Sequence, residues 1–462
     1  MATRTGAWYN GAIMDIQRIA QKKNILILGA GFGGSACART LEDIRRAHPS
    51  SFQDFNIVLV DKKNYYLYTP SLYEIATTAA DDASPLALKR AVGVPIEDIV
   101  AHTAIKFVQG NITNVDLAKK TISFEDGTAL TYEYLVYAIG SEPTYFGIPG
   151  VKEYAISLKW LEDAIRIRAE VKRKYDTKPS GEALAVVIGG GGPAGIEVAA
   201  ELIGYVKNLN KKTGKNVLCS PIIVDGSAHV LPGFDDFTVT KATARLLSVG
   251  VRVKSGSVIA HADEKTVYVK PAPLPPPPPG TGITPPQAPP ATEEALLYDL
   301  FIWGGGVQAA SIPSGDCLMK EKRGRIETDQ CLSCAATGEN LEMTKNVFAL
   351  GDVACFTDPK TKRAMPGTAQ VAVAEAKAVA HNIHRAIEGK PQIPFAPKTA
   401  YLFVIPVGGK YAIAKIGPVR FSGFSGWVFA QLIELYYFYS VTRDPAVIRR
   451  WWRDIKIFTR ND

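Results

Sequence analysis

One short plan of secondary structure occurs twice in this chain, and it constrains the fold more than any other feature. Each copy consists of an apolar strand, a glycine-rich turn, a helix and a second apolar strand that ends in an aspartate. The first copy runs from Asn24 to Asp61, and the second runs from Ala185 to Asp225. Continuous apolar strands of this kind belong to parallel sheets that are covered on both faces. The sequence therefore predicts an α/β fold with two Rossmann-like dinucleotide-binding domains, and hence two bound nucleotides.

The first glycine-rich turn follows the predicted strand Ile25–Leu28 and opens a helix. In such a turn the glycines permit the tight bend, the approach of the backbone to a pyrophosphate and the close packing of helix on strand. The helix N-terminus adds partial positive charge for the phosphates. An aspartate ends the next strand, where it can accept hydrogen bonds from a ribose, and the polar loop 48–56 explains its long distance from the turn. The candidate residues are Gly29, Gly31, Gly34 and Asp61.

The second glycine-rich turn follows the predicted strand Ala185–Ile188 and repeats the pattern with Gly190, Gly192, Gly195 and Asp225. A carboxylate at the end of the second strand binds the ribose hydroxyls of NAD and repels a 2′-phosphate. No arginine stands in the three residues after the aspartate, which are Gly226, Ser227 and Ala228. The sequence therefore favours NADH over NADPH.

Composition narrows the class of protein. Hydrophobic residues make up 47% of the 462 residues and charged residues 21%, which excludes a disordered or fibrous chain. The net charge of +8 is modest for this length, and we predict no nucleic-acid partner from it. Six scattered cysteines fit a reducing compartment. Because no segment reaches the ~20 apolar residues of a spanning helix and no signal peptide is evident, we expect a protein that is soluble or lies on a membrane surface.

Two further motifs connect the two turns to a known family. Residues 134–140 have the pattern of a strand that ends at Gly140, and residues 346–352 that of a late strand that ends at Asp352. With the two turns, they resemble the two-dinucleotide flavoprotein reductases across nearly the whole chain. The resemblance implies that the first turn holds FAD, that the second holds NADH, and that Asp352 contacts the ribityl-pyrophosphate region of the flavin.

Cysteines and shorter motifs select among these reductases. Disulfide reductases carry a cysteine pair after the first turn, where this chain has Cys37 alone. Sulfide:quinone reductases use cysteines in the middle of the chain, but none lies between Cys37 and Cys219. The chain instead resembles the type II NADH dehydrogenases, single-subunit enzymes that reduce membrane quinones without pumping protons. The matching runs are residues 61–74, 231–234, 302–307 and 368–372, and the third of them places Gly306 in the expected NADH site.

The resemblance assigns catalytic roles to Glu197 and Gln370. The family's glutamate after the second turn lies near the nicotinamide and the flavin and is proposed to relay protons to the quinone. A partner for the helix dipole is the alternative for Glu197. Gln370 belongs to the family's quinone-side motif, whose second glutamine is replaced here by Ala374. This departure leaves a one-sided quinone contact, so the quinone species, and whether the acceptor is a quinone at all, stay open. A helix-surface amide is the alternative for Gln370.

The strand pattern and the resemblance together predict four regions. We expect an FAD-binding domain in two parts, residues 23–150 and 304–395. Between them lies an NADH-binding domain, residues 151–303, and a C-terminal membrane-associating region follows at residues 396–462. A proline-rich insertion, residues 271–290, interrupts the NADH-binding domain as a surface loop. Cys331 and Cys334 form a single C-x-x-C pair, which is too few ligands for zinc, so no metal site is predicted.

The C-terminal region is predicted to be an amphipathic helical segment that docks on a membrane. Residues 427–439 are apolar apart from Gln431 and Glu434. After Pro445, apolar residues recur on one side of a helix and basic residues on the other, which is typical of an in-plane interfacial helix. The apolar side consists of Val447, Ile448, Trp451, Trp452, Ile455 and Phe458. Packing on the protein's own core or on a dimer partner is the alternative.

These observations predict an FAD-dependent NADH:quinone oxidoreductase, a possible homodimer, that lies peripherally on the cytoplasmic face of a membrane. Two other functions stay open at this point. One is an NADH-dependent reductase of a soluble electron carrier, which would have no use for an interfacial helix. The other is a redox-responsive interaction protein, which would oxidise NADH slowly with every acceptor.

Overall fold

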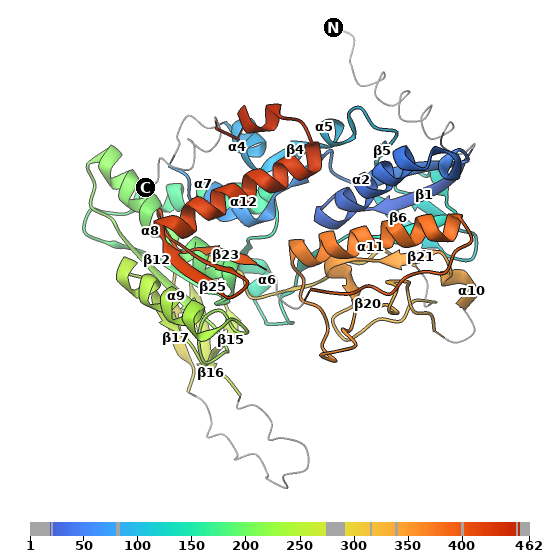
Figure 1. The fold of residues 1–462 in the computed structure, drawn as a ribbon. Coiled ribbons are helices and arrows are strands. Elements are labelled where there is room, and N and C mark those ends of the chain that lie inside the picture. The colour runs from blue at the N-terminus through green and yellow to red at the C-terminus, as the bar shows by residue number, and fades with distance from the viewer. Residues whose placement is uncertain are drawn as a thin grey trace.

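The computed structural model describes residues 19, 22–79, 84–273, 292–314, 317–337, 341–398, 402–449 and 451–452. Two parallel sheets of five strands each form the centres of two lobes (Figure 1). The α/β class and the duplicated dinucleotide-binding plan predicted from the sequence are confirmed.

The first sheet has the strand order β21-β9-β1-β2-β5, and every pairing in it is parallel. Its strands are β1 (Lys23–Leu28), β2 (Phe55–Asp61), β5 (Lys106–Gln109), β9 (Tyr134–Tyr137) and β21 (Val347–Ala349). The late strand β21 joins the same sheet as the first copy of the repeat, so this lobe is built from two separate parts of the chain.

Helices cover one face of this sheet and a small antiparallel sheet covers the other. The helices α2 (Phe32–Ala47) and α11 (Ala369–Ile387) pack side by side. Residues Ile25 and Ile27 of β1 share a core with these helices, whereas Leu26 and Leu28 share a core with the antiparallel sheet. That sheet consists of β6 (Ile112–Asp116), β7 (Thr121–Phe124) and β8 (Ala129–Thr131). The four consecutive apolar residues 25–28 of β1 therefore serve two cores, as a buried parallel strand requires.

The second lobe repeats this layered arrangement. Its sheet has the order β11-β18-β12-β13-β14, again parallel throughout. The strands are β11 (Ile156–Ser157), β12 (Ala183–Gly189), β13 (Leu218–Val224), β14 (Arg252–Lys254) and β18 (Leu300–Trp303). Packed on one face are α7 (Leu161–Thr177) and α8 (Pro193–Thr213), and on the other lie β15 (Ser257–Ala262), β16 (Thr266–Pro271) and β17 (Glu294–Leu297).

The proline-rich insertion lies in the connection between β16 and β17, which pair antiparallel, but residues 274–291 lie outside the described part of the chain. Leu297 ends β17 and Leu300 begins β18, so the chain passes from one sheet to the other around Asp299. Its carboxylate accepts a hydrogen bond from the Ala185 amide at 2.9 Å.

The chain passes between the lobes twice, through two antiparallel strands. These are β10 (Ser141–Pro143) and β19 (Val307–Ala309), which pair with each other. Around them the chain forms shorter elements: β3 (Tyr65–Leu67), α3 (Leu72–Thr77), α4 (Pro85–Val92), β4 (Gly93–Pro95), α5 (Ile96–Val100), α6 (Val151–Tyr154), α9 (Asp236–Val249), β20 (Ile326–Glu327), α10 (Leu341–Thr344) and β22 (Ala354–Cys355).

The C-terminal part of the chain covers both lobes. Three antiparallel strands, β23 (Phe403–Pro406), β24 (Ala412–Ile416) and β25 (Val419–Gly423), pack against α8 and α9 of the second lobe. The helix α12 (Phe424–Thr442) then runs back over α2 and α5 of the first lobe (Figure 1). Within the described residues, no helix combines the length and the apolar character that a membrane crossing needs.

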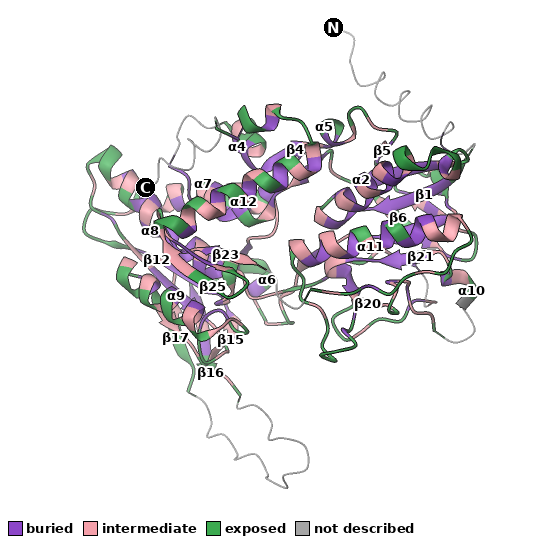
Figure 2. Cartoon of the chain, in the orientation of Figure 1, coloured by how far each residue is buried: buried purple, intermediate pink, exposed green. Residues whose placement is uncertain are grey.

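The proposed apolar side of the last segment needs a correction. Val447 and Trp451 are buried in the core of the first lobe, whereas Ile448 and Trp452 are exposed, and Ile455 and Phe458 lie outside the described residues. Trp451 therefore packs on the protein itself, as the alternative interpretation held. Instead, α12 exposes several large apolar side chains, and Figure 2 colours parts of this helix as exposed.

Candidate active site

The two glycine-rich turns have the same backbone geometry, and the first glycine of each is required by the turn itself. Gly29 has a φ of +101° and Gly190 a φ of +106°. A Cβ atom would lie 2.4 Å from the Ala138 carbonyl oxygen in the first case and 2.5 Å from that of Gly304 in the second. Both the left-handed conformation and the neighbouring strand exclude a side chain.

The third glycine of each turn is required by the packing of the helix. A Cβ atom on Gly34 would lie 1.7 Å from the Gly29 carbonyl oxygen, and one on Gly195 would lie 2.0 Å from the Gly190 carbonyl oxygen. Helix and strand therefore approach each other more closely than any side chain would allow. This matches the role predicted for the third glycine.

The middle glycine of each turn has no such requirement inside the protein. Gly31 has a φ of −77° and Gly192 a φ of −73°, which any residue can adopt. No heavy atom lies within 4 Å of an added Cβ at either position. Space is left open at the N-termini of α2 and α8, where backbone N–H groups and the helix dipole favour a phosphate. The residues present therefore fit a dinucleotide pyrophosphate at both turns.

The two predicted acids are held against these turns in the same way. The Asp61 carboxylate accepts hydrogen bonds from the amides of Ala30 at 2.7 Å and Lys63 at 2.8 Å. The Asp225 carboxylate accepts them from Gly191 at 2.6 Å and Ser227 at 2.7 Å. Each acid is therefore fixed beside a glycine-rich turn, where its remaining lone pairs can accept from ribose hydroxyls. Burial raises the pKa of Asp61, and its backbone hydrogen bonds oppose that rise.

Asp352 lies beside Ser141 of the crossing between the lobes and Lys159 of the second lobe. It follows β21 in a short 3₁₀ turn, and its carboxylate accepts a hydrogen bond from Ser141 Oγ at 2.5 Å. The ammonium of Lys159 donates to the same Ser141 Oγ at 2.8 Å and lies 3.9 Å from the Asp352 carboxylate. Burial lowers the pKa of Lys159, and the charge of Asp352 opposes that shift. Sequence analysis missed Lys159, because no motif connects it to a residue almost two hundred positions away.

Glu197 lies in the first turns of α8 beside two other carboxylates. Burial raises its pKa to about 8, and the charges of Glu74 and Glu201 contribute to the rise. The Glu74 carboxylate accepts a hydrogen bond from the Tyr73 hydroxyl at 3.0 Å, and that of Glu201 accepts one from the Gly409 amide at 3.0 Å. A carboxylate that served only the helix dipole would be stabilised in its charged form. The direction of the pKa shift is the opposite, and at neutral pH it leaves Glu197 mostly protonated.

Gln370 and its neighbours lie at the start of α11. The amide nitrogen of Gln370 donates to the Leu402 carbonyl at 2.8 Å, which ties this helix to the C-terminal sheet. Ala374 packs against the core of the first lobe. Glu375, which sequence analysis did not single out as a site residue, accepts a hydrogen bond from the Gly351 amide at 2.7 Å, and burial raises its pKa to about 8. Glu375 therefore holds the turn that carries Asp352.

Aromatic rings leave no room for a side chain at Gly305 or Gly306. A Cβ atom on Gly305 would lie 2.5 Å from the Trp303 ring, and one on Gly306, which has a φ of +155°, would lie 2.9 Å from the Phe146 ring. The Trp303 indole N–H donates to the Thr144 carbonyl at 2.8 Å. Gly140, the other predicted turn glycine, has a φ of +74° and immediately precedes β10.

An aromatic cluster joins the first turn to α12. The Phe32 ring lies 5.3 Å from that of Tyr66 and 5.3 Å from that of Tyr437, centroid to centroid. Tyr68 is 5.3 Å from Phe438 of the same helix. The C-terminal helix therefore packs on a residue of the first glycine-rich turn.

The cysteine that follows the first turn is buried. All six cysteines are free thiols, and burial raises the pKa of Cys37 to about 12. A thiol of this kind does not supply a thiolate at neutral pH. The exclusion of dithiol chemistry beside the first turn, predicted from the lone cysteine, therefore also has a structural reason.

Comparisons with known proteins agree with this geometry. Residues 23–376 match the family model described as pyridine nucleotide-disulphide oxidoreductase. A type II NADH:quinone oxidoreductase of Staphylococcus saprophyticus is 27% identical over 385 residues, which cover 81% of this chain and 85% of that protein. The type II NADH:quinone oxidoreductase Ndh of Mycobacterium tuberculosis is 25% identical over 447 residues, covering 93% of this chain and 88% of the relative.

Solved structures share the fold. NDH2 from Plasmodium falciparum in complex with NADH has a TM-score of 0.73 at 17% identity and covers 95% of this chain and 97% of its own. The sulfide:quinone oxidoreductase of Aquifex aeolicus has a TM-score of 0.70 at 18% identity and covers 91% of this chain and 92% of its own. The resemblance to type II NADH dehydrogenases, expected from the motifs, is confirmed by the relatives of that name.

Proposed function

Because the chain belongs to the pyridine nucleotide-disulphide oxidoreductase family, we propose that it is a type II NADH:quinone oxidoreductase that uses FAD. The enzyme oxidises NADH and reduces a quinone without pumping protons. Each turnover moves two electrons and consumes one proton from solution in addition to the hydrogen of NADH.

The pair of glycine-rich turns supports this proposal most strongly. Both turns leave the middle glycine open at a helix N-terminus and fix an acid beside it. Two dinucleotides are therefore expected in one chain. FAD would lie at Gly31 and Asp61 with Asp352 on its far side, and NADH at Gly192 and Asp225. When bound, the flavin accepts a hydride from NADH and passes on electrons, while the protein holds and orients the two rings.

Glu197 is the residue best suited to hold the proton that the quinone needs. Its pKa of about 8 keeps it mostly protonated at neutral pH while still allowing proton release. A general acid works best when its pKa lies near the working pH. Gln370 would contact the quinone from the start of α11, with its amide nitrogen already fixed on the Leu402 carbonyl.

The quinone would arrive from a membrane on which α12 lies. This helix has an inverted polarity, because Gln431 and Glu434 are buried while its apolar residues face outward. The outward row, which we term the α12 stripe, comprises Phe424, Val428, Leu432, Tyr436 and Tyr439, which are 38–64% exposed. Their spacing places them along one side of the helix. Relatives named for quinone reduction favour a lipid surface as the occupant, and we propose the cytoplasmic face of the membrane as the location.

Steady-state oxidation of NADH by the purified flavin-loaded protein tests the proposed activity. We expect rapid consumption of NADH with a short-chain benzoquinone or naphthoquinone, with one quinol formed for each NADH. Glu197→Gln should slow quinone reduction in stopped-flow experiments and leave the reduction of the flavin by NADH largely unchanged. Slow turnover with every quinone, together with fast turnover with a soluble iron–sulfur carrier, would refute the proposal.

Co-sedimentation with anionic liposomes tests the docking surface. The double variant Leu432→Glu/Tyr436→Glu should lose binding, whereas Leu247→Glu should retain it, since Leu247 is equally apolar and 60% exposed on α9, away from the stripe. These substitutions are preferable to truncation after Pro445, which would also remove the buried Val447 and Trp451. A double variant that sediments as the unmodified protein does would exclude the α12 stripe as the docking surface.

A further inference from the structure

Two long helices of the first lobe end at the same place, far from their N-terminal ends. α2 begins at the first glycine-rich turn and ends at its C-cap His48. α11 begins beside Gln370 and ends at its C-cap Glu388. Each helix rises about 1.5 Å per residue, so this place lies roughly 24 Å from the predicted cofactor. The proposed function uses none of the residues there.

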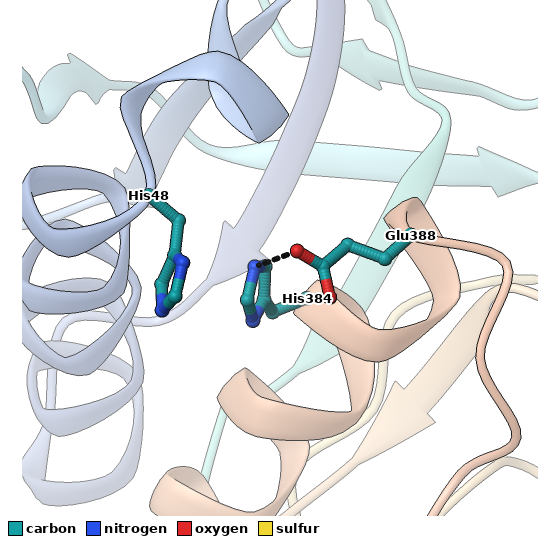
Figure 3. Close-up of side chains that lie close together, drawn as sticks. All are labelled: His48, His384 and Glu388. Carbon is teal, nitrogen blue, oxygen red and sulfur yellow. Dashed lines mark ion pairs between the residues drawn. The ribbon is translucent and has the colours of Figure 1, made fainter.

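Three side chains from these helix ends face one another (Figure 3). His48, His384 and Glu388 each bring one metal-ligating atom into a group in which all such atoms lie within 4.8 Å of one another. His384 and Glu388 are four residues apart on α11, so they project from the same side of the helix. Nε2 of His384 lies 3.1 Å from a Glu388 carboxylate oxygen.

The contacts of His384 leave a ligand position unused. Its Nε2 is buried without a hydrogen bond that meets the geometric criteria, and a Glu388 carboxylate oxygen lies beside it. The ring is held between that of His48, at a centroid distance of 4.7 Å, and that of Phe52, at 5.7 Å. Imidazole nitrogens are common metal ligands.

The carboxylate is held in place by two other groups. Ser51 Oγ donates to one oxygen of Glu388 at 3.2 Å, and the ammonium of Lys390 lies 2.7 Å from the other. Partners of this kind orient a ligand from outside the coordination sphere. The ammonium of Lys390 also competes with any cation for the Glu388 carboxylate.

We propose that His48, His384 and Glu388 bind a divalent transition metal of the zinc type, with water as the fourth ligand. Two imidazoles and one carboxylate are a ligand set that such ions accept. The exposed His48 side chain would turn to bring its ring nitrogen to the ion. Two helix C-termini converge here, and their partial negative charges favour a cation. The ion joins the far ends of α2 and α11, and it stabilises the first lobe without taking part in electron transfer.

Equilibrium dialysis of the chelator-treated, flavin-loaded protein against Zn²⁺ at neutral pH tests the site. We expect the unmodified protein to bind one more zinc ion than His48→Ala, or to bind it at least about tenfold more tightly. His48 is exposed, so this variant should fold. The matched control is His381→Ala, which removes another exposed imidazole from α11, one turn before His384 and outside the group. It should bind zinc as the unmodified protein does.

A second measurement separates this site from zinc held by thiols. Zinc should raise the melting temperature of the unmodified protein and of His381→Ala, but not that of His48→Ala, because only a ligand that binds the folded state stabilises it. Lys390→Ala should tighten binding, since it removes the competing charge. Turnover with NADH should be the same with and without zinc. If His48→Ala binds zinc and gains thermal stability as the unmodified protein does, the site is not formed by these residues.

Discussion

The two glycine-rich turns differ less in their backbone than in what surrounds them. In each turn a Cβ atom added to either outer glycine would lie only 1.7–2.5 Å from a backbone oxygen, whereas one added to the middle glycine would face open space. After the middle glycine, however, the first turn has Phe32, which packs against Tyr66 and Tyr437, whereas the second has the exposed Pro193. A C-terminal helix therefore covers the first turn, and no comparable aromatic contact involves the second among the described residues.

The two turns differ again two residues after the third glycine. The first copy has Ala36 at this position, and the second has Glu197 with its raised pKa. The two copies therefore differ in two respects: α12 packs on the first turn, and the second turn is followed by an acid with a raised pKa. Each of the following predictions tests one part of this comparison.

The largest effect is expected at the first glycine-rich turn. Gly31→Val should fold, because its φ of −77° and the empty space around an added Cβ accommodate a side chain, but it should lose its flavin and all activity. Circular dichroism measures the folding of the variant, and the flavin released on denaturation measures its flavin content. Gly34→Ala should instead lower the free energy of unfolding by about 1–3 kcal/mol, because its added Cβ overpacks the contact between helix and strand. Full flavin occupancy in Gly31→Val would contradict the assignment of this turn.

The equivalent change in the second glycine-rich turn should affect only the use of NADH as electron donor. Gly192→Val should retain its flavin, while kcat/KM for NADH falls by at least about 100-fold, or about 2.7 kcal/mol. Reduction of its flavin by dithionite should remain normal and serves as the control. Loss of flavin from this variant would show that the two turns do not have separate ligands.

A smaller effect is expected from the acids. Asp225→Asn removes the charge that faces a 2′-phosphate but leaves an oxygen for the Gly191 amide. The preference for NADH over NADPH should shrink by about tenfold, or about 1.4 kcal/mol. Asp61→Asn changes the corresponding acid of the other copy and should leave this preference unchanged. The ratio of kcat/KM for NADH to that for NADPH measures this preference. An unchanged ratio in Asp225→Asn would show that the Asp225 carboxylate lies away from the ribose.

The smallest effect concerns stability and pH. The pKa of Glu197 is about 8 in the folded protein and near 4.5 in the unfolded chain. Above pH 4.5 unfolding releases its proton, so this group lowers the free energy of unfolding as pH rises towards 8. Glu197→Gln should therefore be more stable at pH 8 by at least about 1 kcal/mol, with less gain at pH 5.

Urea titrations of the flavin-loaded protein at both pH values measure this difference. Glu182→Gln, at an exposed position before β12, is the control and should change stability equally at both. Some pH dependence should persist in Glu197→Gln, because Glu375 has a similarly raised pKa. A variant that is less stable than the parent at pH 8 would show that the charged carboxylate is stabilised in place.

The sequence predicted the repeated parts of the molecule best. Gly29, Gly34 and Asp61 lie where the pattern placed them, because short local motifs determine a turn, a helix start and a strand end. Contacts between distant segments could not be read in this way. Lys159 meets Asp352 only when the two lobes come together, and His48 meets His384 only when α2 and α11 pack in the first lobe. Trp451 was assigned to the wrong surface, since periodicity identifies an apolar side but not what covers it.

The strand β21 has a consequence for the order in which the chain can fold during synthesis. It pairs with β9 across more than two hundred residues of sequence, and α11, which covers α2, comes later still. The second lobe, by contrast, has all five of its strands between residues 156 and 303. We therefore expect it to be complete on the ribosome while the first lobe still exposes an apolar sheet edge and one side of α2. Hydrogen exchange on chains stalled near residue 340 would show protection in β12 and β13 before it appears in β1 and β9.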